Sequence, residues 1–185
     1  MDISTERVKE LRELSGAGIM DCRNALLQTK GDKEKALQIL KEQNLVRVEK
    51  KSTRAASQGL VETYVHTGGR IGAMVELNCE TDFVARTTEF QELAHNLAMQ
   101  IAAQEPICIS EDQIPKDTDT DPELACLLLQ PFIKDPQQTI QDLITETAAK
   151  VRENIRVSRF ARFELGQAAA RVAELEKEST AHTDA

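Results

Sequence analysis

Histidine and cysteine are the side chains of this 185-residue sequence best suited to hold a metal ion or to act as a nucleophile. They are His66, His95, His182, Cys22, Cys79, Cys108 and Cys126. None of them forms a CxxC or HExxH motif, and the cysteines are not clustered along the chain. A GxxxxGK[ST] phosphate loop and a GxSxG nucleophile elbow are also missing. We therefore expect no catalytic residue, no metal ion and no cofactor, and a protein that acts by binding.

An acidic segment at residues 110–123 superficially resembles a calcium-binding loop. Asp117, Asp119 and Asp121 alternate as the first ligands of such a loop do. The sixth position, however, is Pro122 where glycine is needed, and the twelfth is Leu128 where a bidentate glutamate is needed. We interpret the segment as a solvated surface loop.

The charge of the chain is unevenly distributed. Its formal net charge is −8, but residues 1–58 carry a net +3 and residues 59–185 a net −11. The overall negative charge disfavours a nucleic-acid partner, and the split suggests two units with different surfaces.

Membrane insertion and secretion are not expected either. The longest apolar run, Leu124–Leu129, has six residues, against the roughly 20 that span a bilayer. The N-terminus is charged and amphipathic and lacks the apolar region of a signal peptide. Scattered cysteines without pairing motifs are typical of reduced thiols, so we expect a cytoplasmic protein.

Residues 4–45 predict a bundle of three short helices. Ser15–Gly18 separates the first from the second, and Gly31-Asp32 separates the second from the third, with Asp32 as the N-cap. The expected core positions, from their helical spacing, are Val8, Leu11, Leu14, Ile19, Cys22, Leu26, Ala36, Ile39 and Leu40. Residues 47–58 are basic and read as a linker or as an extended helix end.

From residue 59 the pattern changes to strands and longer helices. Gly68-Gly69 predicts a tight hairpin turn between two strands, and residues 71–78 alternate with Ala73, Val75 and Leu77 on the buried face. One helix is expected from a cap at Thr81 or Asp82 to Pro106. Further expected elements are a helix at 123–130, a turn at 130–136, a helix at 139–153 and a third strand at 156–166, with Val157, Arg159, Ala161 and Phe163 on one face.

These elements predict an α+β protein in two parts. The expected domains are a three-helix bundle (1–46), a basic linker (47–58), an α+β core with a small three-stranded antiparallel sheet (59–166), and a C-terminal tail (167–185).

Two long strings of residues resemble the signatures of the elongation factor Ts family. They are LRELSGAGIMDC at residues 11–22 and NCETDFVA at residues 78–85. The stretches QPFIKD (130–135) and AKVRENIRVSRFARFELG (149–166) resemble later segments of the same family, so the resemblance covers residues 3–166. It implies a ubiquitin-associated-like N-terminal domain, an α+β core, and guanine-nucleotide exchange on the GDP form of elongation factor Tu.

The resemblance also assigns partner contacts. It implies that Thr81, Asp82, Phe83 and Val84 form a wedge, with Phe83 between partner helices and Asp82 disturbing the coordination of the partner's magnesium ion. The alternative from the residues alone is that Phe83 packs on Ala85 or Phe90. Asp82 is expected to cap a helix as well, a role that can coexist with the partner contact.

Four further contacts are implied elsewhere in the chain. Arg12, Ile19 and Met20 match positions at which the family's N-terminal domain binds the partner's nucleotide-binding domain. Ile19 and Met20 could instead belong to the bundle core. His66, beside the hairpin turn, is either a partner contact or a residue of the sheet face.

The single hairpin of this chain is a departure from long family members, whose core has two related halves. The segment YVHTGGRIG (64–72) resembles the hairpin of the second half, whereas NCETDFVA belongs to the first. The chain thus resembles the short members, which implies a homodimer. In such a dimer one protomer supplies Asp82 and Phe83 and the other supplies the His66 hairpin.

Two other functions remain open at this point. One is a ubiquitin-associated-type protein-binding module without exchange activity. The other is RNA binding through the basic residues 47–54, but no aromatic residues are interleaved with them and the rest of the chain is acidic.

Overall fold

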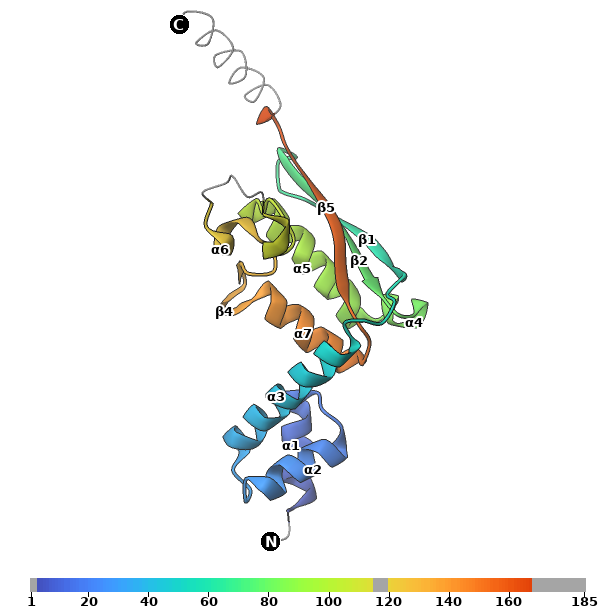
Figure 1. The fold of residues 1–185 in the computed structure, drawn as a ribbon, viewed down its shortest axis with the longest axis vertical. Helices are drawn as coiled ribbons and strands as arrows, with labels where there is room; N and C mark the ends of the chain where they lie inside the picture. The colour runs from blue at the N-terminus through green and yellow to red at the C-terminus, as the bar shows by residue number, and fades with distance from the viewer. Residues whose placement is uncertain (1–2, 115–119, 168–185) are drawn as a thin grey trace, which may run out of the picture.

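A computed structural model describes residues 3–114 and 120–167 of the chain, and residues 44–50 by their backbone alone. The molecule is elongated (Figure 1), with a helical bundle at one end and a mixed core beyond it. The fold class is α+β, as the sequence predicts. Gln167 apart, the tail lies outside the described residues, as do Asp117 and Asp119.

The bundle consists of α1 (Thr5–Ser15), α2 (Ile19–Gln28) and α3 (Lys33–Lys51). Asp32 caps α3 by accepting a hydrogen bond from the Lys35 N–H at 3.1 Å. Because α3 extends to Lys51, residues 47–51 are an extended helix end. The domain limits themselves stay a prediction.

Two residues expected in the bundle core are exposed instead. Leu14 and Ile19 flank the turn formed by Gly16, which adopts a left-handed φ of 63°. The turn directs both side chains away from the centre of the bundle, whose buried members are Val8, Leu11, Ala17, Cys22, Ala25, Leu26, Ala36 and Leu40. The helical spacing thus predicts the buried residues inside each helix, but it is wrong at Leu14 and Ile19, where α1 ends and α2 begins.

The core contains an antiparallel sheet with the strand order β1-β2-β5. β1 (Gln58–Val65) and β2 (Ile71–Cys79) form the predicted hairpin, and its Gly68 and Gly69 both have positive φ. β5 (Arg156–Glu164) pairs with the other edge of β2. The predicted three-stranded sheet is thus confirmed.

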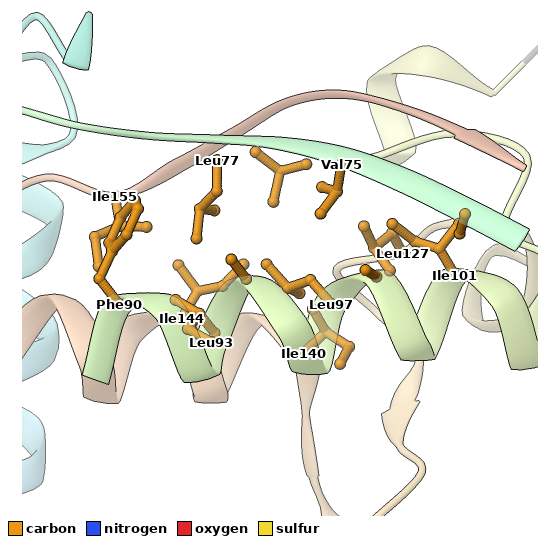
Figure 2. Close-up of a cluster of buried hydrophobic side chains, with 14 of the residues drawn as sticks. Val75, Leu77, Phe90, Leu93, Leu97, Ile101, Leu127, Ile140, Ile144 and Ile155 are labelled. Atoms are coloured by element: carbon orange, nitrogen blue, oxygen red, sulfur yellow. The ribbon is translucent and has the colours of Figure 1, made fainter. Parts of the chain in front are cut away.

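Beneath the sheet lies α5 (Thr88–Gln104), and α7 (Ile140–Val151) packs against α5. Figure 2 shows Val75 and Leu77 of β2 facing Phe90, Leu93 and Leu97 of α5. These side chains are almost completely buried. Among the residues whose side chains the structure describes, this cluster holds 19 buried hydrophobic residues and the bundle cluster holds eight, so the larger apolar core lies between the sheet and its helices.

The helix expected between residue 81 and Pro106 is two helices. A short α4 (Asp82–Ala85) is capped by Thr81, and α5 begins after a second cap at Thr87. The Thr87 hydroxyl accepts a hydrogen bond from the Phe90 N–H at 3.3 Å. The chain turns between the two caps, which the hydrophobic spacing alone did not reveal.

The acidic segment and the residues that follow it also differ from the prediction. A 3-10 turn covers Glu111–Gln113, and α6 covers only Pro122–Ala125. Cys126 then becomes extended because it forms a parallel bridge with Cys108. The expected turn at 130–136 is part of a small hairpin of β3 (Pro131–Phe132) and β4 (Asp135–Thr139).

The predicted faces of β5 are wrong at one end. Glu76 pairs with Arg159 but Leu77 pairs with Val157, so Ser158 forms a bulge. The bulge reverses the alternation: Val157 is buried, whereas Arg159, Ala161 and Phe163 face outward.

The cysteines are free and buried, but two of them lie together although they are 18 residues apart. The sulfurs of Cys108 and Cys126 are 3.2 Å apart. Burial and then the neighbouring Cys108 raise the pKa of the Cys126 thiol to about 12. The described residues hold no group of three or more metal-ligating side chains, and none of their helices could cross a membrane.

Candidate partner-binding surfaces

The corner between β2 and α4 exposes a large aromatic side chain. Phe83 is the second residue of α4 and is 77% exposed. It therefore does not pack on Ala85 or Phe90, which was the alternative to a partner contact. Ala85 is buried and Val84 is packed against the main core, so α4 itself is fixed while Phe83 points outward. An exposed phenylalanine on a fixed corner is suited to insertion into another protein.

Asp82 is the first residue of α4 and not its cap. The cap is Thr81, whose hydroxyl accepts a hydrogen bond from the Val84 N–H at 3.4 Å. The Asp82 carboxylate instead pairs with Arg86 at 2.8 Å, and both side chains are largely exposed. Such a pair contributes at most about 1 kcal/mol, so the carboxylate can exchange Arg86 for another cationic group at little cost.

The backbone of this corner is held by a residue from a distant part of the chain. One oxygen of Glu153, which follows α7, accepts hydrogen bonds from the Glu80 N–H at 3.0 Å and the Thr81 N–H at 2.9 Å. The other oxygen accepts from the Thr81 hydroxyl at 2.6 Å. Burial, and then the negative charge of Glu153, raise the pKa of the neighbouring Cys79 thiol.

A second candidate surface lies on the bundle. Arg12 is in the last turn of α1, and Ile19 and Met20 open α2 on the other side of the Gly16–Gly18 turn. All three are exposed, Met20 by 61%, so neither Ile19 nor Met20 belongs to the bundle core. The three predicted residues thus lie at one corner of the bundle.

His66 lies far from both surfaces, at the tip of the β1–β2 hairpin. β2 runs the full length of the sheet between His66 and the α4 corner (Figure 1), and its eight residue steps span roughly 26 Å at about 3.3 Å each. His66 is exposed, and its Nδ1 lies 3.1 Å from the Tyr64 hydroxyl. A single chain therefore does not bring His66 and Phe83 together.

The outer face of the sheet carries exposed apolar side chains beside the Glu76–Arg159 ion pair, and the sequence pattern did not predict a binding surface there. Val61 and Val65 of β1, Met74 of β2 and Phe163 of β5 are all exposed, Phe163 by 73%. The register places Gly72 opposite both Val65 and Phe163, and Met74 opposite Ala161. In the sequence, this surface is indicated only by apolar residues at the outward-facing positions of strands whose side chains alternate between the two faces.

A hollow of about 350 Å³ lies where the bundle meets the core. Leu14, Leu37 and Lys41 line it from the bundle, and Glu146 and Lys150 of α7 line it from the core.

Comparison with known proteins adds a sequence match to this geometry. A family profile described as "Elongation factor TS" matches residues 7–123. Curated relatives are named "Elongation factor Ts". One from Carboxydothermus hydrogenoformans is 44% identical over 91% of this chain and 92% of its own length.

Two further relatives of the same name have similar statistics. The protein from Caldanaerobacter subterraneus subsp. tengcongensis is 45% identical over 89% of this chain and 98% of its own. The protein from Thermotoga maritima is 42% identical over 90% and 98%. Each match covers nearly the whole of both chains.

Proposed function

The chain belongs to the elongation factor Ts family, and from this premise we propose that it binds the GDP form of elongation factor Tu and promotes release of GDP. Membership makes it a factor of translation elongation. The observation that carries the finer proposal is Phe83, exposed on a corner that the core holds in place.

Exchange of a bound nucleotide requires distortion of the partner and no covalent chemistry in this chain. A nanomolar nucleotide is held by about 12 kcal/mol, and each 1.4 kcal/mol of distortion speeds its loss about tenfold. Coupling is reciprocal, so a factor that weakens GDP binding is itself bound less tightly by the GDP form than by the empty form. Insertion of one aromatic side chain is sufficient to supply part of such a distortion.

Asp82 adds charge to the wedge formed by residues 81–84. Its carboxylate lies next to Phe83 and is held only by the exposed pair with Arg86. We propose that it approaches the magnesium site of the partner, where a negative charge disturbs the ligands of the ion. Thr81 and Val84 serve this wedge by capping α4 and anchoring it to the core.

Arg12, Ile19 and Met20 form the second contact in this proposal, on the nucleotide-binding domain of the partner. In this small patch the two exposed apolar side chains contribute affinity for the partner, and the Arg12 guanidinium helps to orient the contact. A flexible methionine suits such a surface. We propose that this contact holds the factor while the wedge acts.

His66 enters the proposal through a homodimer. Two copies that bury Val61, Val65, Met74 and Phe163 on the outer faces of their sheets form an isologous interface, which a two-fold axis makes self-complementary. Because the hairpin tip and the α4 corner lie at opposite ends of the sheet, antiparallel packing brings His66 of one protomer near Phe83 of the other. Mass measurement at micromolar concentration tests this; monomer alone contradicts it.

A cytoplasmic location belongs to the same proposal. Translation elongation takes place there, and the four cysteines are free thiols. No cofactor, nucleic acid or membrane is needed for the proposed activity.

The decisive experiment measures release of fluorescent GDP from elongation factor Tu with and without this protein. We expect stimulation by the native chain and at least a tenfold lower maximal rate with Phe83→Ala, because the wedge loses its aromatic ring. Leu124→Ala, which truncates another exposed apolar side chain, is the matched control and should not change the rate. No stimulation by the native chain would favour a protein-binding module without exchange activity.

A further inference from the structure

We propose that residues 152–154 form a clamp that fixes the wedge of the core relative to the bundle, with Glu153 as its principal positioning residue. This inference rests on the proposed function, because it assigns a purpose to the spacing between two partner-binding surfaces. It is carried by hydrogen bonds that join three distant segments of the chain at one place.

The first part of the clamp fixes the corner. Glu153 receives three hydrogen bonds from Glu80 and Thr81, at 2.6–3.0 Å. These residues immediately precede Asp82 and Phe83. A carboxylate that accepts backbone N–H groups forms stronger hydrogen bonds than a neutral acceptor. The side chain of Glu153 therefore determines the direction in which α4 leaves the sheet.

The second part joins the corner to the segment after α3. The Asn154 N–H donates to one oxygen of Glu80 at 2.8 Å, and Arg54 lies 3.4 Å from the other oxygen. The buried amide of Asn154 donates to the carbonyl oxygens of Ser52 at 3.2 Å and Arg54 at 2.8 Å. The connection between bundle and sheet is thus held by Asn154 and by Glu80.

The third part reaches the bundle itself. The Lys51 ammonium, in the last residue of α3, donates to the Arg152 carbonyl oxygen at 2.6 Å. A methyl group added at Gly16 would lie 3.1 Å from the Lys150 side chain, and one at Gly18 would lie 3.4 Å from the Arg152 guanidinium. The turn that carries Arg12 and Ile19 on its two sides therefore sits over the end of α7.

Arg152 shapes the clamp through its backbone. It has a left-handed φ of 62°, uncommon for a residue with a side chain, and closes α7 by donating its N–H to the Ala148 carbonyl oxygen. This conformation turns the chain sharply enough for Glu153 and Asn154 to face different neighbours. The strain is offset by the hydrogen bonds of the next two residues.

A clamp at this point has a mechanical role. The bundle surface and Phe83 must contact one partner molecule at the same time. A rigid connection between them lets the binding energy gained at the bundle be used to distort the partner at Phe83. If this connection is flexible, the bundle still binds the partner, but Phe83 moves away from the partner instead of distorting it. Loss of the clamp should thus lower the maximal exchange rate and leave the concentration for half-maximal stimulation almost unchanged.

The test compares two variants of Glu153. Glu153→Ala removes all three acceptor contacts, and we expect a maximal rate about tenfold lower, the equivalent of about 1.4 kcal/mol of lost distortion. Glu153→Gln should restore most of the rate, because its amide oxygen can accept the two N–H groups and its amide nitrogen can donate to the Thr81 hydroxyl. Glu92→Ala, at an exposed glutamate on α5 away from the bundle, is the control.

Hydrogen exchange of the amides of Glu80 and Thr81 reports the clamp without the partner. It should rise in Glu153→Ala and stay low in Glu153→Gln, while the amides of α1 and α2 remain protected. If Glu153→Ala is unfolded at the assay temperature, Glu153→Asp takes its place, since its carboxylate is shorter by one methylene and cannot reach both backbone donors.

The outcomes separate this inference from the proposed function. A normal rate in Phe83→Ala overturns the wedge. A slow Phe83→Ala together with a normal maximal rate in Glu153→Ala overturns the clamp alone. An increase in the half-maximal concentration without a change in the maximal rate also overturns it, because the bundle contact would then be the one affected.

Discussion

The bundle corner at Ile19 and Met20 and the α4 corner of the core are both candidate partner surfaces, but the chain supports them differently. In the bundle, Ile19 and Met20 lie on a helix supported by a small cluster of buried residues. In the core, Phe83 lies on a four-residue helix anchored by a larger cluster and by Glu153. In the proposed function the bundle surface only binds the partner and can tolerate movement, whereas the wedge at residues 81–84 distorts the partner and must be rigid. The weaker support of Ile19 and Met20 and the stronger support of Phe83 are therefore consistent with the proposed roles, binding by the bundle and distortion of the partner by the core.

Truncation of a buried aromatic side chain in the core should have the largest effect on stability, and it tests whether the core and the bundle are stabilised separately. Phe90→Ala removes a completely buried ring between α5 and the sheet, and we expect a loss of about 3–5 kcal/mol in the free energy of unfolding. Denaturant titration followed by circular dichroism measures the loss, and hydrogen exchange shows where it falls. It should fall on the sheet, α5 and α7 and spare α1 and α2.

Leu26→Ala provides the converse variant, because Leu26 is buried in the bundle cluster. Its loss of about 2–5 kcal/mol should be confined to α1–α3. Equal loss of protection in both regions for either variant would mean that bundle and core unfold as one unit, and the comparison would break down.

Removal of the bundle patch should have an intermediate effect and a different kinetic signature. In the double variant Ile19→Ala, Met20→Ala, the concentration for half-maximal exchange should rise about thirtyfold, since each apolar side chain contributes roughly 1 kcal/mol when buried in an interface and each 1.4 kcal/mol is tenfold. The maximal rate should remain close to that of the native chain. Titration of the factor against elongation factor Tu at fixed fluorescent GDP measures both quantities.

Leu27→Ala is the matched control, because Leu27 is exposed at the opposite end of α2. A fall in the maximal rate of the double variant, with an unchanged half-maximal concentration, would contradict the division between binding and distortion.

The smallest effect concerns the Cys126 thiol in the core. Its folded-state pKa of about 12 exceeds the ordinary value of 9.0, so the unfolded chain loses this proton first as the pH rises. The contribution of the thiol to stability is complete below pH 9 and is lost as the pH rises from about 9 to about 12. Up to pH 9.5 the loss should stay below about 1 kcal/mol.

Denaturant titrations at pH 7.5 and pH 9.5 measure this loss, and Cys126→Ala provides the control. The variant should lose less stability than the native chain over the same interval. An equal loss in both would assign the pH dependence to other groups.

Local patterns were sufficient for much of this fold. The Gly68-Gly69 turn, the alternation of residues 71–78 and the helical stripe of residues 140–151 each predict their element from neighbouring residues alone. The predictions fail where a distant segment determines the backbone. Cys126 leaves its helix to bridge to Cys108, and the bulge at Ser158 reverses the faces of β5.

The candidate site divides in the same way. Residues 78–85 form a signature in the sequence, and the order of strand, cap and helix already placed Phe83 at a corner. Its exposure was undecided, since most phenylalanines are buried, and only the packing of Val84 and Ala85 resolved the direction of the ring. Nothing near Glu153 in the sequence indicates that it binds Glu80 and Thr81, 72–73 residues away.

The sequence by itself determined the family, the fold class and the residues that could contact a partner, because these depend on residue types and on local spacing. Only the tertiary structure decided which of those residues are free to make contact and what holds them in place. Exposure and long-range hydrogen bonds are properties of the packed chain. They arise when α7 and β5 meet the end of β2, and no short stretch of sequence contains them.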